Sequence, residues 1–237
     1  MGTEHVFYFS PHQDDELLNF GAAVIRDTDS GLDVHVVLCT DGGASSARRC
    51  LCDGGSCVWH EGSHFFDLSP EAFTAARDGE FIGSCLEMGV PEKNICISPL
   101  RSADGKLSER TAEDIILDAI KAYPAEEVSV KTLAPVYSKP QNPDHTATGE
   151  AAKKLFGAGA FAGLSLFYEL ILLDGSQTPF SGLEKVGLTP AQRERFIAAE
   201  SRYGMWEPEL GSYAVGFHSV YDEFTSQFAE PVSYLLK

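Results

Sequence analysis

Val6-Phe7-Tyr8-Phe9-Ser10-Pro11-His12-Gln13-Asp14-Asp15-Glu16 joins a short apolar run to an imidazole and three acidic side chains. The apolar run is typical of a buried strand. In open α/β sheets, ligands bind just beyond the carboxyl ends of the strands. Adjacent carboxylates repel each other, but a dication such as Zn²⁺ turns carboxylates and a neutral imidazole into ligands. The segment therefore predicts an α/β sheet with a ligand site at the end of its first strand.

Strand-like and helix-like apolar patterns alternate along the rest of the chain. We predict strands at Val6–Phe9, Leu32–Thr40, Asn94–Ile97, Val128–Pro135, Leu164–Leu172 and, as the last, Tyr213–Val220. We predict helices at Glu16–Arg26, Pro70–Met88, Ser108–Tyr123, His145–Phe156 and Thr189–Tyr203, and a long loop at 41–69. This alternation predicts one domain over residues 1–237 with a Rossmann-like three-layer fold, in which helices cover a mainly parallel sheet. The active site is then expected at the C-terminal ends of the strands.

Composition excludes several classes of partner. The formal net charge of −17 argues against nucleic acid and anionic membranes as partners bound through bulk electrostatics. No apolar run reaches the roughly 18 residues that a membrane span needs. The N-terminus shows no secretory signal, so we expect a cytoplasmic protein. The sequence does not decide whether the protein forms a homo-oligomer.

Three cysteines, Cys50, Cys52 and Cys57, fall within the predicted loop, and His60 and His64 follow them. Their spacing matches no standard zinc finger. We favour a loop whose thiols have no specific role. The alternatives are a second metal site and a disulfide between two of the three cysteines, which leaves the third as a free thiol.

A second polar segment, Gln141-Asn142-Pro143-Asp144-His145, also follows a predicted strand and precedes a helix. Two such loops can meet at one edge of a doubly wound sheet. His12 and Asp15 are three residues apart and can face one ion, with His145 as a third ligand. Three protein ligands plus a water is the pattern of catalytic zinc, and Asp14 is then a carboxylate placed to act as general base.

Simpler interpretations exist for each loop. His145 alone is more often a capping or packing residue than a ligand. The acidic residues alone would favour a helix N-terminus through its dipole. Both simpler interpretations lose weight against a metal site when the two loops are considered together. The reason is that both loops fall at predicted strand ends and supply complementary ligand types.

Four stretches resemble motifs of the PIG-L/LmbE family of zinc-dependent N-acetylglucosaminyl deacetylases. They are His12-Gln13-Asp14-Asp15-Glu16, Thr40-Asp41-Gly42, the helix that carries Arg77 and Glu80 and leads to Met88-Gly89-Val90, and Asn142-Pro143-Asp144-His145. They occur in the family's order and cover about the first 150 residues. The remaining part, 157–237, is variable in the family.

The resemblance implies zinc, or another divalent metal, on His12, Asp15 and His145, with Asp14 as general base and acid. The implied reaction is hydrolysis of an N-acetyl or other N-acyl group from an amino sugar or glycoconjugate.

The resemblance also implies roles around the metal. Arg77 is expected near substrate hydroxyls, Asp41 in the lining of the sugar pocket, and Asp144 beside a ligating imidazole. Asn142 stands where the family has a histidine that is thought to stabilise the oxyanion. Asparagine donates only a neutral hydrogen bond, so the oxyanion contact is altered.

Candidates to compensate for Asn142 are Tyr137, His64 and His218, although surface or packing roles are favoured for the two histidines. Two alternative functions follow from the altered site. One is an amidase of the same family that acts on a non-sugar acyl amide. The other is a catalytically impaired carbohydrate- or metal-binding relative, against which the retained Asp14 argues. A dinucleotide-binding protein is disfavoured because the first loop lacks Gly-x-Gly-x-x-Gly.

Overall fold

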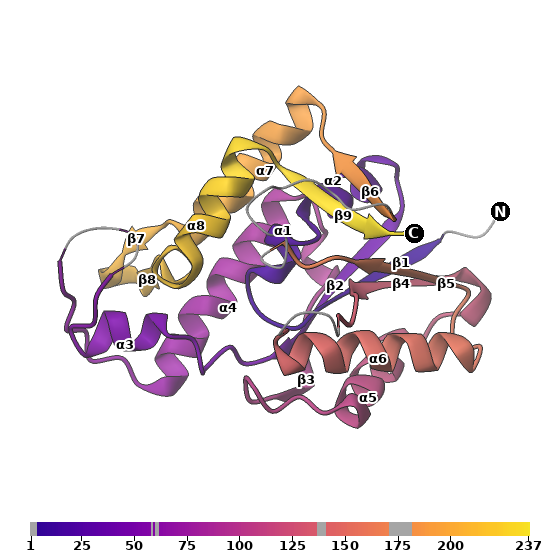
Figure 1. Ribbon diagram of the computed structural model, residues 1–237, viewed down its shortest axis with the longest axis horizontal. Helices are drawn as coiled ribbons and strands as arrows, with labels where there is room; N and C mark the ends of the chain where they lie inside the picture. The colour runs from indigo at the N-terminus through magenta and orange to yellow at the C-terminus, as the bar shows by residue number, and fades with distance from the viewer. Residues whose placement is uncertain (1–3, 58, 60–61, 137–140, 171–181) are drawn as a thin grey trace.

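A mainly parallel sheet forms the centre of the molecule, and helices cover both of its faces (Figure 1). The computed structural model describes residues 4–57, 59, 62–136, 141–170 and 182–237. In this part of the chain, seven strands lie side by side in the order β3 (Ile95–Ser102), β2 (Asp33–Thr40), β1 (His5–Ser10), β4 (Val128–Leu133), β5 (Gly163–Phe167), β9 (Val232–Leu236) and β6 (Leu183–Gly187). Strands β1 to β5 pair in parallel, whereas β9 is antiparallel to both of its neighbours. The predicted α/β fold with a mainly parallel sheet is confirmed.

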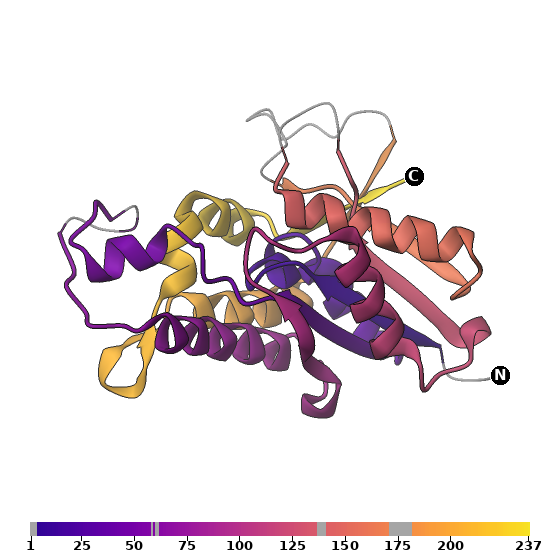
Figure 2. The same cartoon turned by 90° about the horizontal axis from the view of Figure 1, so that it is seen from below.

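The helices divide between the two faces of the sheet, as Figures 1 and 2 show. One face carries α5 (Glu109–Ile120) and α6 (Pro143–Gly157). The other carries α1 (Asp15–Leu18), α2 (Gly21–Asp29), α4 (Pro70–Glu87), α7 (Pro190–Tyr203) and α8 (Val215–Ala229). Shorter elements complete the description: α3 (Ala47–Cys52), the 3₁₀ turns η1 (Glu92–Asn94), η2 (Ala125–Glu127) and η4 (Pro208–Leu210), and the hairpin of β7 (Trp206–Glu207) and β8 (Ser212–Tyr213).

Strand β1 is buried on both faces because its side chains alternate between two apolar cores. Phe7 and Phe9 pack in the core that α5 and α6 cover. Val6 and Tyr8 pack in the core that α2, α4, α7 and α8 cover. This explains the continuous apolar run, since a parallel strand covered on both faces has no polar face to present.

The predicted helix Glu16–Arg26 is wrong in one respect, because the structure divides it into α1 and α2 at Asn19. The amide of Asn19 donates to Oδ1 of Asp15 at 2.8 Å, and its oxygen accepts from the backbone of Leu170 at 2.8 Å. The second of these bonds ties the break to a segment 151 residues away. The apolar period could not show this, because it continues across the break.

The C-terminal part departs further from the prediction. The last predicted strand, Tyr213–Val220, is wrong: β8 ends at Tyr213, and α8 begins at Val215. A short buried apolar run has the same appearance in a strand and in a helix, so its period does not decide between them. Strands β6 and β9 have no predicted counterpart, and the predicted loop 41–69 contains α3. Residues 171 and 172 of the strand predicted at Leu164–Leu172 lie outside the described residues.

None of the helices in the described ranges is both long and apolar enough to cross a bilayer.

Gly149 allows α6 to lie close to the end of β4. A Cβ atom at Gly149 would lie 2.5 Å from the carbonyl oxygen of Leu133 and 2.7 Å from Cδ of Pro135. His145 lies four residues earlier and therefore on the same face of α6. The close approach of the helix thus helps to bring His145 to the carboxyl end of the sheet.

Gly149→Ala is expected to lower the free energy of unfolding by about 1–3 kcal/mol, because the added methyl group meets backbone atoms that cannot move aside. Gly157→Ala in the same helix is the matched control. A Cβ atom there has nothing within 4 Å, and alanine is the better helix former, so stability should be unchanged or slightly higher. Urea unfolding measures both variants, and equal effects would contradict the close approach.

Candidate functional site

Strand order brings the two polar loops together. β1 and β4 are neighbours in the sheet and run in parallel, so their carboxyl ends lie at one edge. His12 and Asp15 follow β1, and His145 lies in the first turn of α6, which comes after β4. The predicted meeting of the two loops is therefore present in the fold.

Three buried donor atoms form a compact triangle at this edge. Nδ1 of His12 lies 2.9 Å from Nε2 of His145 and 3.4 Å from Oδ2 of Asp15. Nε2 of His145 lies 3.2 Å from the same Oδ2. Two ligands of a tetrahedral zinc with bonds of about 2.0–2.1 Å are about 3.3 Å apart. The donor set therefore fits a zinc ion in both chemistry and spacing.

Carboxylates lie against the outer nitrogen of each imidazole. Nε2 of His12 lies 3.2 Å from Oδ2 of Asp144 and 3.2 Å from Oδ1 of Asp104. Nδ1 of His145 lies 3.0 Å from Oε2 of Glu169. The contact of His12 with Asp144 is a hydrogen bond, whereas His145 and Glu169 are at ion-pair distance without hydrogen-bond geometry. Carboxylates in such positions favour the proton on the outer nitrogen and leave the inner nitrogen with a lone pair for a metal.

The same groups perturb the pKa values of the imidazoles. Burial lowers the pKa of His145, but the carboxylates of Asp15 and Glu169 outweigh burial and raise it to about 9. The pKa of His12 is likewise raised well above its usual value, because Asp104, Asp144 and Asp15 outweigh burial. The site therefore binds protons strongly, and a metal would have to displace them.

Glu169→Gln is expected to weaken metal affinity by about 10–100-fold, because the amide cannot provide the negative charge that supports the imidazole of His145. Competition with a chromophoric chelator measures the Kd for zinc. Glu126→Gln removes an exposed carboxylate outside the site and should leave the Kd unchanged. An unaltered Kd in Glu169→Gln would show that this carboxylate does not support the ligand.

Asp14 occupies a strained backbone conformation beside the triangle. Its φ is 114° and its ψ is −36°, a region that residues other than glycine rarely adopt. Such strain persists only where the surroundings impose it, and it concentrates at functional sites.

Arg77 of α4 holds this conformation in place. Its Nη2 donates to the carbonyl of Gln13 at 2.6 Å and to Oδ2 of Asp14 at 3.0 Å, and its Nη1 donates to the carbonyl of Gly42 at 2.7 Å. A Cβ atom at Gly42 would lie 2.6 Å from Nη1 of Arg77, so the turn after β2 needs glycine for this approach. Burial raises the pKa of Asp14 to about 6, and the guanidinium of Arg77 opposes that rise.

A pocket of about 680 Å³ opens beside these groups. Its lining includes all three donors of the triangle together with Asp14, Arg77 and Asn142. Six further polar residues of the lining had not been assigned to the site from the sequence: Asn19, Ser45, Asp104, Glu169, Ser219 and Glu223. The pocket is therefore strongly acidic.

The remaining predicted site residues have distinct positions. Asn142 caps α6 by accepting a hydrogen bond from the backbone of Asp144 at 2.9 Å, so the helix begins at Pro143 rather than at His145. Asp144 is fully buried and accepts from the backbone of Gly105 and Leu107. Its Oδ2 also lies 3.2 Å from Nε2 of His12, and the role of that imidazole as a metal ligand stays a prediction.

Asp41 does not join this pocket. It lines a neighbouring cavity of about 400 Å³ with Asp78 and Arg101. Its Oδ1 accepts from the backbone of Gly43 and of Asp104, each at 2.9 Å. A contact between Asp41 and the sugar stays a prediction.

Two of the candidates to compensate for Asn142, His64 and His218, do not line the described pocket. His64 and His218 contact each other elsewhere, with their Nε2 atoms 3.3 Å apart. Tyr137 lies outside the described residues.

Sequence signals for the unassigned residues were weak. Glu169 is an acid inside an apolar run, and Asp104 is an acid followed by glycine after a predicted strand. Both features also occur in ordinary turns and caps.

Solved structures share this fold at low sequence identity. A triple mutant of a deacetylase from the teicoplanin biosynthetic pathway is 20% identical with a TM-score of 0.65, over 98% of this chain and 96% of that chain. N,N'-diacetylchitobiose deacetylase from Pyrococcus horikoshii, complexed with its inhibitor MPG, is 20% identical with a TM-score of 0.57, over 87% and 75%. GalB, the 4-carboxy-2-hydroxymuconate hydratase from Pseudomonas putida KT2440, is 12% identical with a TM-score of 0.56, over 98% and 96%. The likeness shows the fold, and the hydratase shows that the fold alone does not specify deacetylation.

Among curated proteins, no match was found. The PIG-L family model, described as GlcNAc-PI de-N-acetylase, matches residues 7–156. This match includes both polar loops and the helix that carries Arg77. Because it spans more than half of the sequence, the chain belongs to the PIG-L family.

Proposed function

We propose that this protein is a metal-dependent hydrolase that removes the N-acetyl group from an amino sugar or glycoconjugate. The observation that carries the proposal is the triangle of His12, Asp15 and His145 with the strained Asp14 beside it in one pocket. Membership of a family described by de-N-acetylation supports the reaction type. The spacing of the donors favours zinc, although other divalent metals accept two imidazoles and a carboxylate.

His12, Asp15 and His145 would hold the metal, and the carboxylates of Asp104, Asp144 and Glu169 would orient the two imidazoles. When bound, the metal supplies a Lewis acid that polarises the acyl carbonyl and makes a water molecule more acidic.

Asp14 would act as the general base. It accepts the proton of the attacking water at its carboxylate and later delivers that proton to the leaving amine. The hydrogen bonds from Arg77 fix the carboxylate in direction and keep it next to the metal ligands. The strained backbone serves the same purpose, since it aims Asp14 into the pocket while Asp15 faces the triangle.

Arg77 is accordingly proposed to position Asp14, which adds to its predicted contact with substrate hydroxyls. Asn142 lies at the pocket and can donate a neutral hydrogen bond from its amide to the developing oxyanion.

The charge of the pocket indicates which substrates are suitable. Among its described lining residues, Arg77 is the one lysine or arginine, and it already donates to Asp14 and two carbonyls. Five carboxyl groups line the same space: Asp14, Asp15, Asp104, Glu169 and Glu223. Burial raises the pKa of Glu223 to about 8, so the negative charge comes mainly from the other four. A neutral N-acetylated sugar, whose product is an ammonium ion, suits this field better than an anionic substrate.

An amine-release screen tests the proposal. The purified protein is assayed with N-acetylglucosamine, N,N'-diacetylchitobiose, an N-acetylglucosaminyl glycoconjugate and simple N-acetyl amides, with and without added Zn²⁺. Release from the sugars that depends on metal is the expected result. Release only from non-sugar amides would favour the amidase alternative. That alternative follows from Asn142, because its neutral side chain changes the oxyanion contact from the family pattern. If no amine were released from any of these substrates, the alternative of a catalytically impaired binding protein would be favoured.

A further inference from the structure

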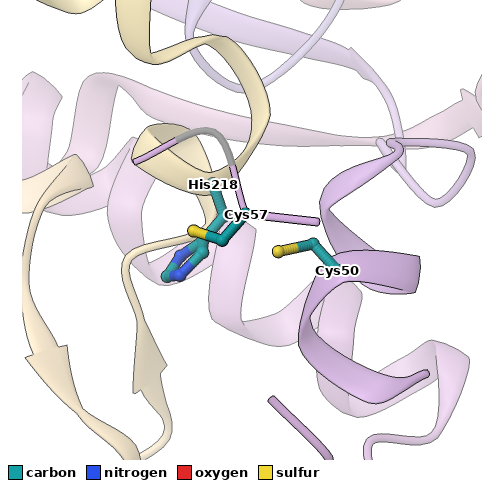
Figure 3. Close-up of side chains that lie close together, drawn as sticks. All are labelled: Cys50, Cys57 and His218. Carbon is teal, nitrogen blue, oxygen red and sulfur yellow. The ribbon is translucent and has the colours of Figure 1, made fainter. Parts of the chain in front are cut away.

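Two cysteines and a histidine from separate parts of the chain meet away from the pocket. Cys50 lies on α3, Cys57 lies in the segment that follows it, and His218 lies in the first half of α8 (Figure 3). A ligand atom of each, the two Sγ atoms and one ring nitrogen, lies within 4.8 Å of the others. None of the three lines the pocket around His12. The cluster is therefore separate from the site described above.

The hydrogen bonds of His218 prepare it for coordination. Its side chain is 2% exposed, and its Nδ1 lies 2.8 Å from the carbonyl oxygen of Ala214. A carbonyl only accepts, so this contact places the proton on Nδ1 and leaves a lone pair on Nε2. Ligating histidines in metal sites commonly donate their other N–H to a backbone carbonyl in this way.

Another imidazole lies next to that lone pair. Nε2 of His64 is 3.3 Å from Nε2 of His218. Two nitrogens at this distance can share one proton, or both can coordinate one ion. His64 therefore lies beside the cluster through His218, although it is outside the group of donor atoms that all lie within 4.8 Å of one another.

Two aromatic rings pack against His218. The ring centroid of His218 lies 5.1 Å from that of Trp59 and 5.3 Å from that of Trp206. Cys50 is buried, and burial together with the nearby thiol of Cys57 raises the pKa of Cys50 to about 11. The thiol of Cys50 thus stays protonated at neutral pH unless a cation offsets the negative charge of its thiolate, and a coordinated dication does so.

We propose that Cys50, Cys57 and His218 form a second, structural zinc site, with His64 as the fourth ligand once its ring moves toward the two thiols. Thiolate and imidazole are the donors that structural zinc prefers, and four protein ligands close the site to substrate. The spacing of the cysteines matches no finger because the site is assembled across α3 and α8 rather than within one hairpin.

The proposed site would fasten the cysteine segment to the wall of the pocket. His218 immediately precedes Ser219, and Oγ of Ser219 lies 3.0 Å from Oγ of Ser45. Both serines line the pocket around His12. A metal that joins α3 to α8 would therefore hold this wall in place without taking part in the chemistry.

Metal counting on the full-length protein tests the proposal. We expect about two zinc ions per chain in the wild type and about one in Cys57→Ser or His218→Ala. Cys52→Ser is the matched control, because Cys52 lies in the same segment but outside the cluster, and it should retain two. Loss of the structural zinc should raise KM more than it lowers kcat. Equal zinc content in Cys57→Ser and Cys52→Ser would overturn the proposal.

Cobalt substitution tests the second site in the wild-type protein, so the main readout does not require a substituted protein to fold. Thiolate coordination should produce a sulfur-to-cobalt charge-transfer band that His145→Ala retains and Cys57→Ser loses. Absence of the band in the wild type loaded with two cobalt ions would overturn the second site while leaving the site at His12 untouched.

Alkylation under denaturing, non-reducing conditions should label all six cysteines once a chelator is added. Two unlabelled cysteines would indicate a Cys50–Cys57 disulfide in place of the metal.

Discussion

His145→Ala is expected to abolish metal binding at the pocket and to lower kcat/KM by more than about 100-fold. Loss of a carboxylate behind a ligand typically costs 10–100-fold in metal affinity or activity, and loss of the ligand itself costs more. The triangle would keep only His12 and Asp15, whose donor atoms lie 3.4 Å apart. The measurements are zinc content after dialysis and the initial rate of amine release.

Two controls separate ligand loss from general damage. His5→Ala removes an imidazole at the opposite end of β1 and should keep both metal and activity. Wild-type protein treated with a chelator should lose activity to the same extent as His145→Ala and regain it on addition of Zn²⁺. Normal zinc content at the pocket in His145→Ala, judged in a chain that also carries Cys57→Ser, would contradict the proposed ligand set.

Asp14→Asn is expected to retain metal and to lower kcat by about 10²–10⁴-fold, the usual contribution of a positioned acid or base. Asparagine has nearly the same shape and can still accept a hydrogen bond from Arg77, so the backbone conformation and KM should change little. It cannot accept the proton of the attacking water. Zinc content and the separate values of kcat and KM test the prediction.

Asp114→Asn removes an exposed carboxylate on α5 and serves as the control for the change in net charge. Its kcat should equal that of the wild type. If Asp14→Asn were as active as the wild type, another group would have to be the base. A variant that lost metal together with activity would instead place Asp14 among the groups that hold the ion.

Local sequence determined the first half of the site. His12, Asp14 and Asp15 lie within four residues at the end of a buried strand, so one short turn keeps them close to one another. His145 was predictable for a related reason, because parallel strands place their carboxyl ends at one edge, and β1 and β4 are neighbours.

Long-range packing decided what the sequence could not show. The apolar period predicted a strand at Tyr213–Val220 where α8 begins, and it missed the break at Asn19, which depends on Leu170. Glu169 and Asp104 reach the two imidazoles only because the ends of β5 and β3 lie at the same edge as that of β1. Arg77 looked like a substrate contact, and only its bonds to Gln13 and Asp14 show the link to the strained backbone.

The sequence by itself therefore determined the fold class, the two site loops and the chemistry of their donors, because these depend on apolar periodicity and on residues close together in the chain. The tertiary structure alone decided which carboxylates support the imidazoles, how Asp14 is aimed and how Cys50 and Cys57 meet His218. Those contacts join residues up to 168 positions apart, and the packing of helices on the sheet sets them rather than any local pattern.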